Sequence, residues 1–91
     1  MPSSRDVPEI SRFHGIAIGM FYEEHGVPHF HAVYGGHKMS VEIESGRLRG
    51  ELPIGPRRLV LAWAALHKAE LLVNWGRARQ GQPLARIAPL E

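Results

Sequence analysis

The stretch HFHAVYGGHKMSVEIESGRLRGEL, residues 29–52, decides the fold of this chain. Apolar residues alternate with polar ones along it, which is the period of a half-buried β-strand. Gly35-Gly36 and Ser45-Gly46 interrupt the alternation, and both pairs suit a two-residue hairpin turn. The pattern therefore predicts a meander of antiparallel strands: His29–Tyr34, His37–Glu44 and Arg47–Leu52.

The two turns also predict which residues stand opposite each other, because directly opposed residues of an antiparallel pair share a face. The first turn pairs Tyr34 with His37, Ala32 with Met39 and Phe30 with Val41. The second pairs Ile43 with Leu48, Val41 with Gly50 and Met39 with Leu52, which extends the same apolar face. The opposite face should be solvated or bind a ligand, and it holds His29, His31, Val33, Lys38, Ser40, Glu42, Glu44, Arg47, Arg49 and Glu51.

The flanking segments complete a single α+β domain over residues 1–91. Gly15–Glu23 alternates as a further strand, so an antiparallel meander of about four strands occupies residues 10–54. One long C-terminal helix is expected from Pro56 to Arg79, within residues 56–80, with Gly81 and Pro83 as its stop. Residues 1–9 should form a loose tail, and residues 81–91 an extended arm packing on a neighbour. The helix should cover the apolar face of the sheet with one stripe: Leu59, Ala62, Trp63, Leu66, Ala69 and Val73.

Composition limits the class of protein. The chain has no cysteine, which excludes a disulfide framework and favours a reducing, cytoplasmic compartment. Its longest apolar run, Leu59–Leu66, is far shorter than the roughly 20 residues that cross a membrane, so no membrane association is expected. Residues 47–91 carry 8 Lys/Arg against 3 Asp/Glu, an asymmetry that indicates a polyanion or an acidic protein as partner.

Histidines are concentrated between residues 25 and 37. His29 and His31 point to the same polar face, and with His25 they are the candidate catalytic residues, because imidazole exchanges protons near neutral pH. The hairpin register places His37 on the apolar face, apart from this group. An HxH pair alone lacks the third and fourth ligands that zinc requires, so no metal ligand set and no cofactor are predicted.

Three cations, Lys38, Arg47 and Arg49, share the polar face with these histidines, and Phe21 of the first strand can join them. Such a surface suits RNA or DNA, which proteins bind through phosphates and stacked bases. The alternative is an ordinary charged face of cross-strand ion pairs, because the register sets Glu42 opposite Arg49 and Glu44 opposite Arg47.

The predicted helix carries two further groups of residues. His67, Glu70 and Asn74 lie beside the core stripe and are expected to be hydrogen-bonded, which would lock the helix to the sheet. Leu61, Leu72 and Trp75 project from the other side and are the candidate partner interface, for a homodimer or a small protein partner. The tail packing back over them is the alternative.

Several motifs resemble one bacterial family: Ile10-Ser11-Arg12-Phe13, Glu24-His25, Pro28-His29-Phe30-His31-Ala32, Leu66-His67, Asn74-Trp75 and Gly81-Gln82-Pro83-Leu84. The family is domain of unknown function 4160, and the likeness covers nearly the whole chain. The resemblance implies no settled activity, but genes of this family often neighbour another small domain, as in toxin–antitoxin pairs. It implies Arg12, His25, His29, His31, His67 and Asn74 as the positions to test first, with Arg12 added to the nucleic-acid-binding candidates. Gly19 replaces a basic residue that relatives often place in the first strand, which weighs against a nucleic-acid role.

Three hypotheses follow. The leading one is a small prokaryotic toxin–antitoxin-type protein that contacts RNA or DNA through its histidine and arginine face and a partner through its helix. The second is a small hydrolase or nuclease that uses His29 or His31, with or without a metal. The third is a protein-binding module without catalysis that works through Leu72 and Trp75.

Overall fold

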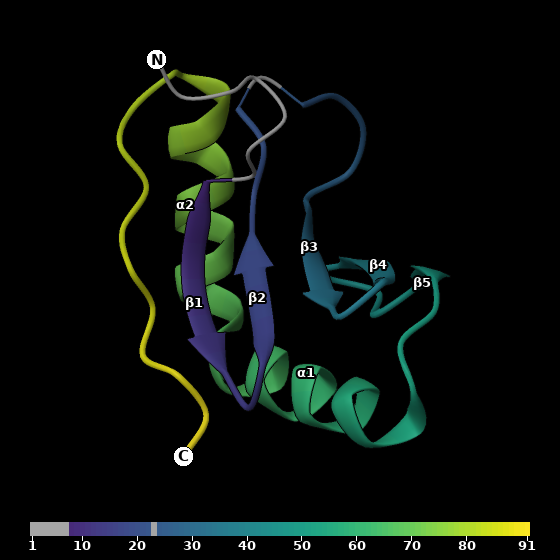
Figure 1. The fold of residues 1–91 in the computed structure, drawn as a ribbon. Coiled ribbons are helices and arrows are strands. Elements are labelled where there is room, and N and C mark those ends of the chain that lie inside the picture. The colour runs from purple at the N-terminus through teal and green to yellow at the C-terminus, as the bar shows by residue number, and fades with distance from the viewer. Residues whose placement is uncertain (1–7, 23) are drawn as a thin grey trace.

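A five-stranded antiparallel sheet followed by two helices forms the domain, in a computed structural model that describes residues 8–22 and 24–91 (Figure 1). The strands lie in chain order: β1 (Glu9–Phe13), β2 (Ile16–Gly19), β3 (His29–Tyr34), β4 (His37–Glu42) and β5 (Leu48–Gly50). The helices are α1 (Ile54–Leu66) and α2 (Lys68–Arg79). The predicted α+β meander is confirmed, with one more strand and one more helix than expected.

The additional strand is β1, which pairs with β2 across a turn at His14 and Gly15. Both turn residues have positive φ, 50° and 76°, as a primed two-residue turn requires. Glu9, expected in the loose tail, is the first residue of β1. Residues 1–7 of the expected tail lie outside the described residues. The same holds for Glu23, the predicted end of the next strand.

The first predicted register is confirmed, since Tyr34 stands opposite His37 and Phe30 opposite Val41. The second is wrong by two residues: Val41 faces Leu48, and Met39 faces Gly50. A longer loop replaces the two-residue turn, with the Gly46 amide donating to the Glu42 carbonyl at 2.9 Å. Strands β4 and β5 are therefore shorter than predicted.

A slip of two residues keeps every side chain on its expected face, because the side-chain period of a strand is two. Phe30, Ala32, Met39 and Val41 are buried, whereas His29 and His31 lie on the other face. The slip does change the cross-strand partners. Arg49 stands opposite Ser40, so the expected pairing with Glu42 is wrong.

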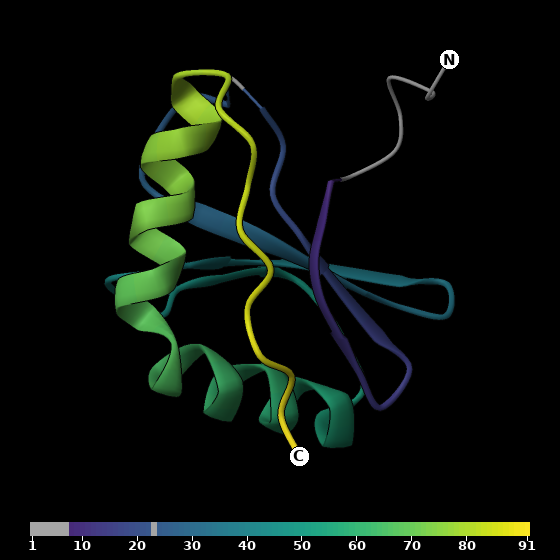
Figure 2. The same cartoon turned by 90° about the vertical axis from the view of Figure 1, so that its left-hand side faces the viewer.

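The predicted single helix is wrong, because the helix breaks at His67, whose φ is −119° and ψ 25°. Beyond this residue α2 turns steeply away from α1, so that the helices cover different parts of the sheet (Figure 2). Only Val60 and Trp63 of α1 are buried, and Leu66 and Val73 of the expected core stripe are 70% and 56% exposed. The apolar stripe was calculated for one straight helix, and it is no longer a continuous buried face once the helix axis changes direction at His67.

The break also buries part of the expected partner interface. Trp75 is only 5% exposed and belongs to the hydrophobic core, and Leu72 is partly buried against that core. Leu61 alone of the three remains on the surface, 37% exposed. These residues therefore do not form one outward face.

The C-terminal arm runs back along β1 and across both helices of its own domain (Figures 1 and 2). The Ile87 amide donates to the Ile10 carbonyl at 2.8 Å, and the Trp63 indole donates to the Ala88 carbonyl at 2.8 Å. Buried Asn74 exchanges two hydrogen bonds with the Ala85 backbone, both at 2.9 Å. Asn74 therefore locks α2 to the arm, not to the sheet as expected.

The other two members of that polar group pair with each other, since His67 Nδ1 lies 2.6 Å from a Glu70 carboxylate oxygen.

None of the helices in the described part of the chain is long and apolar enough to cross a membrane.

Candidate functional site

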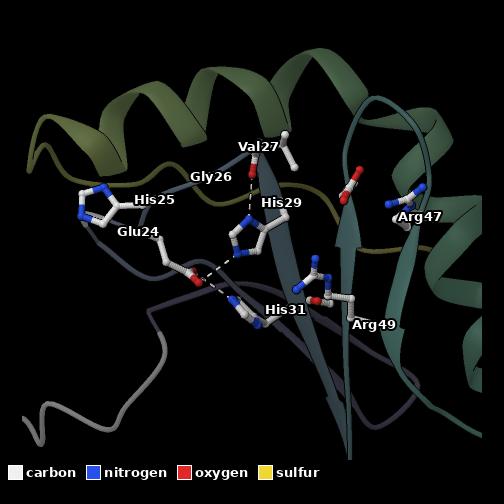
Figure 3. A pocket seen from close by; sticks show the side chains of 10 residues that line it. Glu24, His25, Gly26, Val27, His29, His31, Arg47 and Arg49 are labelled. Carbon is white, nitrogen blue, oxygen red and sulfur yellow. Dashed lines mark hydrogen bonds and ion pairs between the residues drawn. The ribbon is translucent and has the colours of Figure 1, made fainter.

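Two imidazoles and one carboxylate meet on the polar side of β3 (Figure 3). His29 and His31 project from alternate positions of the strand, which puts both on the same face. Glu24, from the loop that precedes β3, reaches between them. One of its oxygens lies 2.9 Å from His29 Nε2 and the other 2.9 Å from His31 Nε2. We call these three residues the His–Glu cluster.

Besides its contact with Glu24, the His29 ring is held by Val27 and by Trp75. Its Nδ1 lies 2.8 Å from the Val27 carbonyl oxygen, which can only accept, so Nδ1 carries a proton. The indole of Trp75 packs against the ring at a centroid distance of 5.0 Å. Trp75 was expected at a partner interface, but it packs against His29 and supports the candidate site.

His31 is held in a similar way by Phe21, whose ring meets it edge-on at 4.8 Å. The side chains of His29, His31 and Glu24 are 16%, 24% and 30% exposed, so the His–Glu cluster is partly buried and open to solvent on one side.

Burial raises the pKa of Glu24, but the hydrogen bonds with His31 and His29 together outweigh it, and the pKa lies below its ordinary value. Glu24 is therefore a carboxylate at neutral pH. Glu24 was not among the residues predicted for the site. The available signal was the Glu24-His25 motif beside the HxH pair, but no spacing in a loop predicts where a side chain ends.

A hollow of about 330 Å³ opens in front of the cluster. Arg47 and Arg49 line it on the side away from Glu24 (Figure 3). Ser40 and Glu42 are also among the lining residues. Within residues 8–22 and 24–91, no ion pair includes Arg47, Arg49 or Lys38. The expected ion pairs are thus not formed. Arg49 stands opposite Ser40, and the Glu42 carboxylate accepts a hydrogen bond from the Ser45 hydroxyl at 2.6 Å.

A second groove continues from the first along the same face. Phe21, His31, Lys38 and Arg49 line it, so an aromatic ring and two cations adjoin the cluster. The hollow and this groove share His31, Ser40 and Arg49.

The remaining candidate residues do not belong to the cluster, although Arg12 lines a further pocket together with His31. His25 lines the hollow, but its ring points away from His29 and His31 (Figure 3). His37 is exposed at the β3–β4 turn. Arg12 is bound to Glu9, with contacts of 2.7 and 2.9 Å, and this hydrogen bond, followed by that from Arg86, lowers the pKa of Glu9. Arg12 thus shares the Glu9 carboxylate with Arg86, so that one negative charge faces two guanidinium groups.

This arrangement suits two kinds of chemistry. The His–Glu cluster can hold either a proton or a cation, because all its ligand atoms lie within 4.8 Å of one another. The guanidinium groups across the hollow can hold an anion, and arginine matches phosphate with two parallel hydrogen bonds.

Comparison with known proteins finds one family. The model of a domain of unknown function (DUF4160) matches residues 15–76, which contain the whole His–Glu cluster and both arginines of the hollow. No curated protein and no solved structure matches the chain.

Proposed function

The chain belongs to the DUF4160 family, and we propose that it binds single-stranded nucleic acid across the polar face of its sheet and hydrolyses a phosphodiester bond there. The observation that carries the proposal is the position of Arg47 and Arg49. They line the same hollow as the His–Glu cluster and have no carboxylate partner among the described residues.

Binding is supported by the chemistry of the two grooves. Phosphates need cations that are not already paired, and Lys38, Arg47 and Arg49 supply them along one face. The ring of Phe21 lies in the second groove beside Arg49, where a base can stack on it. The hollow and the second groove adjoin along one face of the sheet and can admit a single strand, whose bases and phosphates are both accessible.

Hydrolysis is supported by the cluster that faces those arginines. A phosphate held by Arg49 would lie beside the His–Glu cluster, where a water molecule can be deprotonated and added to phosphorus. The bond from phosphorus to the leaving oxygen then breaks, and that oxygen takes up a proton. The arginines would stabilise the negative charge that develops on the phosphate oxygens.

The test uses a fluorescently labelled single-stranded RNA and a DNA of the same sequence. Wild-type protein should bind in anisotropy titrations and shorten the strand on a denaturing gel. His31→Ala should bind but not cleave, while His37→Ala, which changes an exposed histidine outside the cluster, should do both. Wild-type protein that binds neither strand would overturn the proposal, and equal cleavage by His31→Ala would remove the cluster from it.

A toxin–antitoxin-type role and a homodimer or small protein partner stay predictions. Their support is now two exposed apolar side chains, Leu66 and Val73, each of which is more exposed than the residues first chosen for a partner. Sedimentation of wild-type protein and of Leu66→Glu tests them. A monomer in both cases would contradict the homodimer.

A further inference from the structure

We propose that Glu24, His29 and His31 bind one divalent metal ion of the zinc class. The ion's binding stands on the geometry of the three side chains, and only its role as the reaction centre rests on the proposed function.

The first argument comes from the hydrogen bonds of His29. Because Nδ1 donates its proton to the Val27 carbonyl, a neutral His29 has a lone pair, not a proton, on Nε2. That lone pair points at a carboxylate oxygen of Glu24 only 2.9 Å away. Two acceptors at this distance repel each other unless a cation lies with them.

That cation is either a proton on Nε2, which gives the hydrogen bond to Glu24 described above, or a metal ion in its place. Histidines that bind metals usually donate their other ring N–H to a backbone carbonyl or carboxylate, which fixes the tautomer and aims the lone pair. The bond from His29 to Val27 has this form. A proton on Nε2 would satisfy only the contact between His29 and Glu24, whereas a metal ion would be shared by all three side chains.

The second argument is the size of the set. Zinc binds histidine nitrogen and carboxylate oxygen at about 2.0–2.2 Å, which puts the ligand atoms of a tetrahedral site about 3.4 Å apart. Here the two carboxylate contacts are 2.9 Å, and all ligand atoms lie within 4.8 Å. Small rotations of the side chains are enough to admit the ion.

Both imidazoles are already held in place. Trp75 packs on His29 and Phe21 on His31, so neither ring has to be ordered when the ion binds. Ligands fixed by packing and by a second hydrogen bond lose little conformational entropy on binding.

The third argument concerns the open side. Two histidines and one glutamate leave a fourth position of a tetrahedral ion empty, which is the arrangement of catalytic zinc sites. In this chain that side faces the hollow lined by Arg47 and Arg49. A water molecule at the fourth position would lose its proton more readily than free water does, beside groups that hold a phosphate.

The experiment titrates EDTA-treated, full-length protein with zinc chloride by isothermal calorimetry. Wild-type protein should bind one ion per chain. Glu24→Gln, which keeps the shape of the side chain, and His31→Ala should each weaken zinc binding by more than about 100-fold. This exceeds the loss of affinity expected when a residue that only hydrogen-bonds to a metal ligand is removed. His37→Ala, which changes an exposed histidine at the β3–β4 turn, outside the cluster and the hollow, should bind as tightly as wild type.

Circular dichroism of each variant separates loss of the site from loss of the fold. Cobalt(II) gives a second readout, since a four-coordinate ion absorbs strongly in the visible range and His31→Ala should abolish that band. Wild-type protein that binds neither ion, or folded Glu24→Gln and His31→Ala that bind zinc as wild type does, would overturn the inference. Zinc binding without nucleic-acid binding would remove the proposed function and leave the metal site standing.

Discussion

The loss of one arginine should change the salt dependence of nucleic-acid binding by a calculable amount. Lys38, Arg47 and Arg49 have no ion-pair partner in the part of the chain that the structure describes, so each can neutralise one phosphate. Each phosphate contact with a single strand contributes about −0.7 to the slope of log K against log salt concentration. Wild-type protein should therefore show a slope of about −2, and Arg49→Ala about −1.4.

In an anisotropy titration these slopes are easy to separate. Raising the salt concentration from about 50 to about 200 mM should weaken wild-type binding about 20-fold and Arg49→Ala binding only about sevenfold. Arg86→Ala is the matched control, because Arg86 bonds Glu9 on the β1 side of the domain, 3.0 Å from its carboxylate. Its slope should equal that of wild type. A slope near zero for wild-type protein, or an equal change in Arg86→Ala, would refute the reasoning.

Three further predictions concern the scaffold. Asn74→Ala should lower the free energy of unfolding by about 2 kcal/mol in urea titrations, since two hydrogen bonds to the Ala85 backbone are lost; a change below about 0.5 kcal/mol would contradict the lock. Gly50→Ala should lower the free energy of unfolding by more than about 1 kcal/mol, because Gly50 has a φ of 81° and an added Cβ would clash with the Lys38 carbonyl oxygen. Gly36→Ala is the control: its Cβ would meet open space, so its free energy of unfolding should be close to that of wild type. The pKa of Glu9 is lower in the folded protein than in the unfolded chain, so its ion pairs stabilise the fold at pH values above the unfolded-state pKa. This stabilisation is lost as the pH falls through the folded-state pKa. An NMR titration should find the pKa of Glu9 raised in Arg12→Ala, and an unchanged value would count against the pairing.

The sheet was largely predictable because its pattern is local. Alternation and a glycine pair placed His29 and His31 on one face and Phe30 on the other. The second turn was placed wrongly, yet the faces were right, because an error of two residues preserves the alternation. Strand β1 was missed although His14-Gly15 is a turn signal of the same kind.

The helical part was less predictable, because a stripe of apolar residues identifies a buried face only while the helix axis stays straight. The break at His67 gives each helix its own buried face. Leu66 and Val73, expected in the core, are exposed, and Trp75, expected outside, is buried against His29. Nothing in the spacing of these residues distinguishes the two outcomes.

The sequence by itself determined which side chains share a strand face, because that depends only on the two-residue period and on neighbours joined by short turns. It therefore identified His29, His31 and Arg49 as residues of one surface. Only the tertiary structure brought Glu24 between the imidazoles, separated Arg49 from Glu42, and set Trp75 behind His29. These contacts depend on the path of a loop and on how α2 packs, and both are decided by the whole core and not by any local period.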